Sequence, residues 1–141
     1  MIIDAHSHLQ DQRLCEKVGL ELPPSMLNPD ALVEEQLESG IDLSIISGPR
    51  VMDFAVENGS MNPVEVATEY NDFVTELMLN HQSSFAGLGI AYPFADDLML
   101  REMERAVKEL GLRGFVISPT CEGEFIDSPK ALPFFDLCQK L

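Results

Sequence analysis

Four short apolar segments alternate with helical segments along the whole chain, and this alternation restricts the fold more than any other feature. The four segments, which are often β-branched and show no strict polar–apolar alternation, are Met1–Ala5, Ile41–Ser47, Ala86–Tyr92 and Gly114–Ser118. Such segments are typical of parallel strands that are buried on both faces. The series therefore predicts an α/β fold of parallel β/α units with right-handed crossovers, either a doubly wound sheet or a (β/α)8 barrel.

Helix boundaries in the sequence agree with this series. Three helices are predicted to begin at the dipeptides Asn28-Pro29, Asn62-Pro63 and Ser128-Pro129, where a capping side chain precedes a proline that needs no donor. Gly40 and Gly111 are predicted to end the first and third helices. The helices therefore fill the intervals between the predicted strands and follow the last one.

Two long connections, Leu9–Leu27 and Gly48–Met61, follow the first and second predicted strands. We expect them to be irregular, and their length favours the site-forming loops of a barrel. Neither a G-x-G-x-x-G nor a G-x-x-x-x-G-K-[ST] loop is present, so dinucleotide-binding and P-loop functions lose their main support. We expect one domain over residues 1–141, with no second domain.

The charge of the chain excludes some partners. Twenty-four acidic residues against nine basic ones give a formal net charge of −15, which disfavours nucleic acid and anionic membranes. No apolar run approaches the roughly 20 residues of a membrane-spanning helix. The first residues have no basic region, and Asp4 and His6 interrupt their apolar run, so we expect no secretory signal and a cytoplasmic location.

The three cysteines, Cys15, Cys121 and Cys138, are not spaced as C-x-x-C. This argues against a disulfide framework and against structural zinc. Cys138 falls on the apolar stripe of a helix and is expected in the core. Cys121 is expected in a loop beyond the fourth strand, with a passive role favoured over a place in a site.

The most informative local motif is His6-Ser7-His8, which follows the first apolar run. Side chains two residues apart on a strand point to the same side, so both imidazoles can reach one metal ion. They can also be ordinary polar side chains at the end of a sheet. Because functional groups gather at strand ends in α/β proteins, the position favours the metal-binding interpretation.

Several motifs together give the chain a resemblance to a known family. They are, in order, Ile3-Asp4-Ala5-His6-Ser7-His8, Gly40-Ile41-Asp42, Ile45-Ile46-Ser47, Tyr70-Asn71-Asp72-Phe73, Phe85-Ala86-Gly87-Leu88, Tyr92-Pro93, Glu104-Arg105-Ala106-Val107, Glu109-Leu110-Gly111 and Arg113-Gly114-Phe115. In order and spacing they resemble the N-terminal half of the amidohydrolase-related family that includes aminocarboxymuconate-semialdehyde decarboxylase. The resemblance extends over essentially the whole chain.

This resemblance implies the first four units of a (β/α)8 barrel of the metal-dependent hydrolase type. It also implies that His6 and His8 bind a catalytic divalent metal, commonly zinc, at the C-terminal mouth of the barrel. The remaining metal ligands and proton-transfer residues of the family lie near the ends of strands five to eight. Those strands are absent here, because Leu141 falls within the helix after strand four and a complete barrel takes about 250 residues.

Three explanations of the incomplete barrel remain open. The chain is a fragment or truncated product of an enzyme, or a homodimer whose halves close a barrel around two H-x-H pairs, or an open inactive domain. Truncation is the simplest of these. The remaining histidine, His81, is predicted at the surface at the end of the second helix, away from the mouth, and is not expected to be a third ligand.

By resemblance the function is that of a metal-dependent hydrolase or decarboxylase acting on a small organic acid, ester, lactone or amide. The decarboxylases of the family typically hold a substrate carboxylate with an arginine between strand 1 and helix 1, and no arginine occurs between Leu14 and Pro49. Arg50 can take this substrate-binding role or lie in an exposed loop. No catalytic residue is assigned. The alternative function is a non-catalytic binding module that keeps the fold without a complete metal site.

Overall fold

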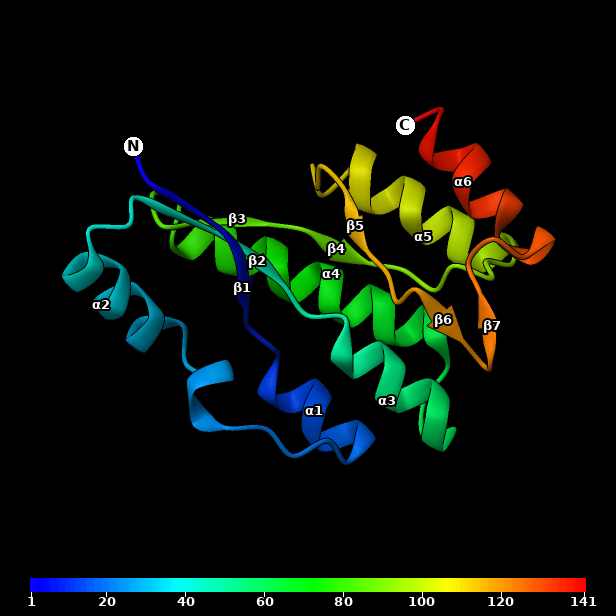
Figure 1. Ribbon diagram of the computed structural model, residues 1–141, viewed down its shortest axis with the longest axis horizontal. Helices are drawn as coiled ribbons and strands as arrows, with labels where there is room; N and C mark the ends of the chain where they lie inside the picture. The colour runs from blue at the N-terminus through cyan, green and yellow to red at the C-terminus, as the bar shows by residue number, and fades with distance from the viewer.

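The structure of the protein is a computed structural model that describes residues 1–141. Figure 1 shows strands in the middle of the molecule with helices packed around them. In chain order the elements are β1 (Ile3–His8), α1 (Gln12–Val18), η1 (Pro24–Met26), α2 (Pro29–Ser39), β2 (Leu43–Ser47), α3 (Arg50–Asn58), α4 (Pro63–Asn80), β3 (Phe85–Gly87), β4 (Gly89–Ile90), α5 (Asp97–Lys108), β5 (Phe115–Val116), β6 (Thr120–Cys121), β7 (Glu124–Phe125), η2 (Pro129–Ala131) and α6 (Leu132–Cys138).

The principal strands are parallel, as the sequence predicts. β1 pairs with β2, β2 with β3, and β4 with β5, all in parallel. Leu88 joins β3 to β4: its amide donates to the carbonyl of Ile46 on β2, and the next amide, that of Gly89, donates to Gly114 before β5. The parallel strands therefore follow one another in chain order across the molecule, with β1 and β5 at the two edges.

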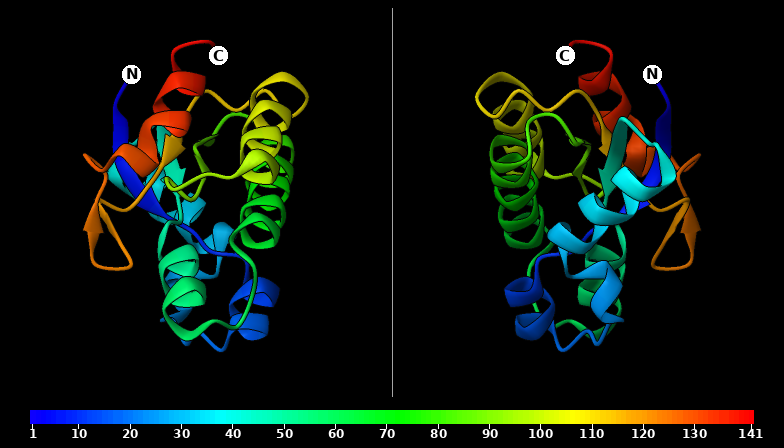
Figure 2. Two further views of the ribbon diagram at one scale, coloured as in Figure 1. Left: turned by 90° about the vertical axis from the view of Figure 1, so that its right-hand side faces the viewer. Right: turned by 90° about the vertical axis from the view of Figure 1, so that its left-hand side faces the viewer.

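The second and third predicted helices cover one face of these strands. α4 packs directly against β3 and β4, and α5 packs against α4. In the side views of Figure 2, α4 and α5 lie together on one side, whereas β1 and the β6–β7 hairpin lie on the other. The core beneath α4 contains fully buried Tyr70, Val74 and Met103 among 22 clustered apolar residues. The opposite face of the strands leaves Ile3 and His6 exposed.

The predicted helix boundaries are confirmed. The side chains of Asn28, Asn62 and Ser128 accept hydrogen bonds from the amides of the first turns of α2, α4 and η2. Gly40 ends α2 in the left-handed conformation, and Gly111 adopts a positive φ just beyond α5. Local capping chemistry therefore sets where these helices begin and end.

Two expectations were wrong. The connections Leu9–Leu27 and Gly48–Met61 are not irregular, because they contain α1 with η1, and α3. Buried residues three and four apart hold both helices on the core: Leu14 and Val18 in α1, Val51 and Ala55 in α3. Cys138 is exposed rather than in the core, because it is the last residue of α6, one turn beyond Phe134, the buried residue of that helix. No helix of the protein has both the length and the apolar composition required to span a bilayer.

Candidate metal centre

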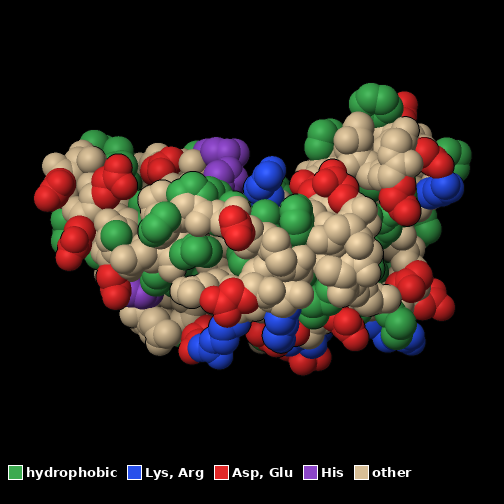
Figure 3. All heavy atoms as spheres, turned by 90° about the horizontal axis from the view of Figure 1, so that it is seen from below, with side chains coloured by type: hydrophobic (Ala, Val, Ile, Leu, Met, Phe, Trp, Pro, Cys, Tyr) green, Lys and Arg blue, Asp and Glu red, His purple; other side chains and the backbone are tan.

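His6 and His8 lie close together at the carboxyl end of β1. Their ring centroids are 4.5 Å apart and their planes meet at 81°. His6 is exposed and His8 is partly buried. Figure 3 shows histidine side chains in two separate places, the larger patch lying at the upper margin of the molecule. The two imidazoles are therefore close enough to bind one ion and open to solvent from the same side.

The backbone at this point departs from a regular ladder. Between Asp4 and Ser7 β1 advances by three residues, while its partner β2 advances by two, from Ser44 to Ile46. Such an extra residue locally bends a strand and redirects its side chains. The carboxylate of Asp4 accepts hydrogen bonds from the Ser7 hydroxyl and from the His6 amide at 3.1 Å. The Ser7 bond and then the His6 bond hold the pKa of the Asp4 carboxyl below its ordinary value.

The ring of His8 is oriented by the next strand. Its Nδ1 lies 3.0 Å from the carbonyl oxygen of Ser47 and 3.3 Å from the Ser47 hydroxyl. Because a carbonyl oxygen only accepts, the bond to it requires a proton on Nδ1. Nε2 then carries the free lone pair that a metal requires. This is the arrangement in which metal-binding histidines are usually held.

Tyr70 of α4 contacts the carboxyl ends of both β1 and β2. The hydroxyl of fully buried Tyr70 donates to the carbonyl of Leu9, at 3.2 Å, one residue after His8. A Cβ atom on Gly48, one residue after Ser47, would lie 2.5 Å from the Tyr70 ring. Only glycine therefore allows this close approach, and a single side chain positions both strand ends.

The 141 residues contain no group of three or more histidine, cysteine, aspartate or glutamate side chains that could hold a metal ion. His6 and His8 therefore stand as a pair, without a third such side chain beside them. His81 lies at the C-terminal end of α4, with its Nε2 4.0 Å from the Asp30 carboxylate and its ring against Phe85. It does not join His6 and His8, as the sequence predicts.

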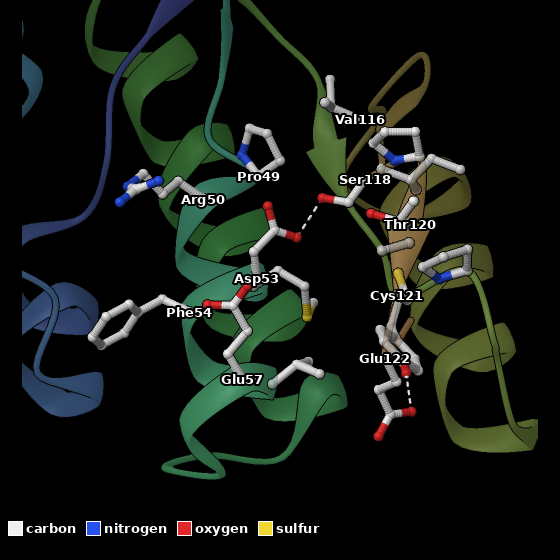
Figure 4. A pocket seen from close by; sticks show the side chains of 17 residues that line it. Pro49, Arg50, Asp53, Phe54, Glu57, Val116, Ser118, Thr120, Cys121 and Glu122 are labelled. Carbon is white, nitrogen blue, oxygen red and sulfur yellow. Dashed lines mark hydrogen bonds between the residues drawn. The ribbon is translucent and has the colours of Figure 1, made fainter. Parts of the chain in front are cut away.

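A cavity of about 280 Å³ lies at the carboxyl ends of the strands, between α3 and the segment that follows β5. Arg50, the first residue of α3, is one of its lining residues and is exposed. In Figure 4 the Arg50 side chain extends away from Ser118, on the other side of α3. It forms no ion pair. His6 and His8 do not line this cavity.

Sequence reasoning missed three polar groups of this cavity, those of Asp53, Tyr92 and Glu122. The Ser118 hydroxyl donates to the Asp53 carboxylate, and the Tyr92 hydroxyl donates to Glu122 at 2.7 Å (Figure 4). Burial, followed by the Glu122 hydrogen bond, raises the pKa of Tyr92. Burial is also the main reason why the pKa of the Cys121 thiol rises to about 11, so this thiol is protonated at neutral pH. Asp53 could have been found only by recognising α3 in the sequence.

Comparison with known proteins identifies the family. The amidohydrolase family profile matches residues 3–141. The chain is 26% identical over 140 residues to 2-amino-3-carboxymuconate-6-semialdehyde decarboxylase of Dictyostelium discoideum, covering 99% of this chain and 39% of that protein. It is 35% identical over 106 residues to γ-resorcylate decarboxylase of Polaromonas sp., covering 72% of this chain and 30% of the relative. The chain therefore spans well under half the length of the curated relatives that it matches.

Solved structures give the same result for the fold. The 5-carboxyvanillate decarboxylase of Sphingomonas paucimobilis superposes with a TM-score of 0.82 at 20% identity, over 99% of this chain and 49% of that one. The dihydroxybenzoic acid decarboxylase of Polaromonas sp., solved with manganese and 2-nitroresorcinol bound, superposes with a TM-score of 0.71 at 24% identity, over 99% and 46%. The resemblance seen in the sequence is confirmed: this chain belongs to the amidohydrolase family.

Proposed function

We propose that the chain is the N-terminal half of a metal-dependent decarboxylase or hydrolase of the amidohydrolase family, and that His6 and His8 are its metal ligands. The observation that carries the proposal is the pair of imidazoles 4.5 Å apart, one of which bonds through Nδ1 to the carbonyl of Ser47. This bond leaves Nε2 of His8 for the metal and holds the ring in place. An ordinary surface histidine has no need of such an oriented ring.

The donor set fits a divalent ion. Imidazole nitrogens suit zinc, and they also occur around manganese together with oxygen ligands. Zinc is the ion that the sequence resemblance implies, whereas a related structure contains manganese. A bound ion supplies a Lewis acid that polarises a substrate oxygen, or lowers the pKa of a bound water. In this chain, β1 positions the imidazoles of His6 and His8, and the Ser47 carbonyl orients the ring of His8.

The substrate is proposed to be a small organic acid, with decarboxylation favoured over hydrolysis of an ester, lactone or amide. Support comes from the relatives, which are named as decarboxylases of carboxylated muconate or dihydroxybenzoate compounds. Arg50 is exposed beside the cavity at the strand ends and has no acidic partner, so its guanidinium is available to bind a carboxylate. The same cavity is also lined by Asp53 of α3 and by Ser118 after β5, which are hydrogen-bonded to one another.

Activity requires completion of the site. A catalytic zinc normally takes about three protein ligands and keeps one position open, and this chain offers two. We therefore propose that the 141 residues, as the first four units of a (β/α)8 barrel, are inactive until further chain or a second copy supplies the other half. A cytoplasmic location stays a prediction.

The test is a metal-binding measurement by equilibrium dialysis of the chain against Mn²⁺ and Zn²⁺. His6→Ala and His8→Ala should each weaken metal affinity by about tenfold or more. Loss of a residue that only hydrogen-bonds to a ligand typically has an effect of this size, and loss of the ligand itself should cost at least as much. His81→Ala is the matched control and should bind as the wild type does. Equal binding by all three variants would contradict the assignment of the ligands.

A second candidate function is a non-catalytic binding module that retains the fold. The observation that favours it is the lack of any three-residue metal site within the chain. It predicts no bound Mn²⁺ or Zn²⁺ at micromolar concentrations and no effect of His6→Ala. The same dialysis experiment therefore separates the two functions.

A further inference from the structure

The cavity at the carboxyl ends of the strands is formed by three segments that are separate in the sequence. α3 forms one wall, residues 116–122 form the wall that faces it, and residues 91–93, which follow β4, contribute as well (Figure 4). The Ser118 hydroxyl donates to the Asp53 carboxylate from one wall to the other. The two walls are therefore joined by a hydrogen bond between two of the residues that line the cavity.

The cavity is small and partly apolar. Its volume of about 280 Å³ lies just below the roughly 300–1,000 Å³ of most small-molecule pockets. Met52, Ala91 and Cys121 line it and are buried. Such a space suits a ligand whose apolar body is about the size of a single ring.

Carboxylates prevail among the charged groups around the cavity. Asp53, Glu57 and Glu122 line it, against the single basic residue Arg50. Asp53 accepts from Ser118 through Oδ1 only, and Glu122 accepts from a hydroxyl through Oε2 only, so one oxygen of each carboxylate has no donor in the protein. These oxygens can accept hydrogen bonds from a ligand, and their charge repels a carboxylate of the ligand.

The one cation beside these carboxylates points elsewhere. Residues three apart on a helix are neighbours, yet no ion pair joins Arg50 to Asp53. In Figure 4 the Asp53 side chain is directed toward Ser118, whereas the Arg50 side chain extends to the other side of α3. Arg50 therefore leaves the charge of Asp53 uncompensated, and the space between the walls keeps an excess of negative charge.

A second side-chain bond holds the wall of residues 116–122 in place. Glu122 lies at the turn between β6 and β7 with a φ of 49°, in the left-handed region that few residues other than glycine adopt. Its carboxylate accepts from the Tyr92 hydroxyl at 2.7 Å. This bond ties the β6–β7 hairpin to the segment after β4. Because Thr120 and Cys121 of the same hairpin line the cavity, the bond also fixes their position.

A neutral hydroxyl group suits these surroundings better than an ammonium group. Both can donate to Asp53, but an ammonium group must also leave water beside the buried apolar residues Met52 and Ala91. Removing a full charge from water costs far more than removing a hydroxyl group. The donors that the protein itself presents to these carboxylates, Ser118 and Tyr92, are neutral hydroxyls too.

We propose that this cavity holds the end of the substrate that carries no carboxylate, that Asp53 accepts a hydrogen bond from a neutral hydroxyl group there, and that the negative charge excludes a second carboxylate. The choice of ligand rests on the proposed function, because the ligand is then a small organic acid. Asp53 determines specificity: this chain selects hydroxylated monocarboxylic acids over dicarboxylic acids. Arg50, on the other side of α3, stays free for the carboxylate.

The first experiment titrates the 141-residue chain with phenol, methoxybenzene and benzoate and follows the backbone amides by ¹H–¹⁵N NMR. Phenol should shift the amide signals of Tyr92, Ser118 and Cys121 with a Kd of about 1–10 mM, as expected for so small a probe. Methoxybenzene lacks the donor and benzoate carries a repelled charge, so each should bind there about tenfold more weakly. Equal affinities, a preference for benzoate, or no shift with phenol would overturn the proposal.

Benzylamine, which is a cation at neutral pH, separates attraction of charge from recognition of a hydroxyl group. It should bind in the cavity more weakly than phenol, because its ammonium group loses more hydration. Tighter binding of benzylamine than of phenol would overturn the preference for a neutral donor.

Asp53→Asn tests the residue itself. The amide keeps the shape of the side chain and an acceptor oxygen for Ser118, but it removes the charge. The Kd of phenol should rise by about tenfold, because a hydrogen bond to a charged acceptor is the stronger one, and benzoate should bind more tightly. Asp136→Asn is the matched control, since Asp136 is exposed on α6 outside the cavity. An unchanged ratio of the phenol and benzoate affinities in Asp53→Asn would overturn its role.

A second variant guards against misfolding of Asp53→Asn. Glu57→Gln removes another carboxylate of the cavity at an exposed position of α3. It should tighten benzoate binding by about threefold, because one repulsive charge is lost. Unchanged benzoate affinity in this variant would overturn charge as the cause of the exclusion.

The probe titrations need no metal, so their outcome is independent of the proposed ligands His6 and His8. Metal binding by these histidines together with equal affinities for phenol and benzoate would overturn the hydroxyl site alone. A preference for phenol without metal binding would leave the hydroxyl site standing and would overturn the proposed ligands.

Discussion

The Tyr70 hydroxyl donates a hydrogen bond to the carbonyl of Leu9 at 3.2 Å and so links α4 to the end of β1, 61 residues away in the chain. Both groups are buried. Tyr70→Phe leaves this carbonyl without its partner and should lower the free energy of unfolding by about 1 kcal/mol. Urea denaturation measures the loss. Tyr92→Phe removes a more exposed bond, to Glu122, and should cost less; equal losses would show that the Tyr70 bond has no special importance.

Gly48 is predicted to be irreplaceable by alanine. The added Cβ would lie 2.5 Å from the Tyr70 ring, which is fully buried and cannot move away freely. Overpacking of this kind costs about 1–3 kcal/mol. Thermal unfolding of Gly48→Ala should show a clearly lower midpoint temperature than that of the wild type. Gly114→Ala is the control, since its Cβ would meet Leu88 at 3.4 Å, an ordinary contact; a drop as large there would argue against the close approach as the cause.

Gln10 is 2% exposed, and neither side-chain Nε2 nor Oε1 has a hydrogen-bond partner. An unpaired buried amide costs free energy that an apolar side chain of similar size avoids. Gln10→Met should therefore raise the free energy of unfolding by about 1 kcal/mol. Urea denaturation tests this, and a marked loss of stability would mean that the amide is satisfied by buried water.

Two of the three thiols are predicted to be unreactive. Burial raises the pKa of Cys15 and of Cys121 to about 11, whereas Cys138 is exposed. At pH 8 a thiol with that pKa is about 0.1% thiolate, so one fast and two slow thiols should appear in a titration with a disulfide reagent. Three fast thiols would contradict the packing of Cys15 and Cys121.

The same two thiols give a pH dependence of stability. The folded chain keeps two protons that the unfolded chain releases near pH 8.5, an approximate value for a free thiol. The unfolded state then binds fewer protons, so stability falls as pH rises from about 9 toward 11. Replacing Cys15 by alanine should flatten this fall in urea titrations across the same range.

The features of the fold that the sequence predicts best are those that neighbouring residues determine, above all the ends of helices. Asparagine–proline pairs at Asn28 and Asn62, and the left-handed Gly40, mark helix ends by themselves. The apolar runs alone do not predict α1 and α3, although Asp11 caps α1 and Gly19 ends it. The short β6–β7 hairpin depends on the turn at Glu122 and Gly123 and has too few residues to show a period.

In the candidate site, too, local features can be predicted from the sequence, whereas contacts between distant residues cannot. The adjacency of His6 and His8 follows from two-residue spacing, although an extra residue in β1 alters the register there. The bond between His8 and the Ser47 carbonyl joins residues 39 apart, and no local pattern encodes it. The same is true of Asp53 and Ser118, which meet only when α3 and the segment after β5 are in place.

The most direct test of the central claim is a long-range ¹H–¹⁵N spectrum of the histidine rings during titration with Zn²⁺. The chain has three histidines, so each can be assigned by one substitution. Before zinc, His8 should show a proton on Nδ1. On addition of zinc, ring nitrogens of His6 and His8 should shift together while those of His81 stay unchanged. Rings that all stay unchanged, or a shift confined to His81, would contradict the account.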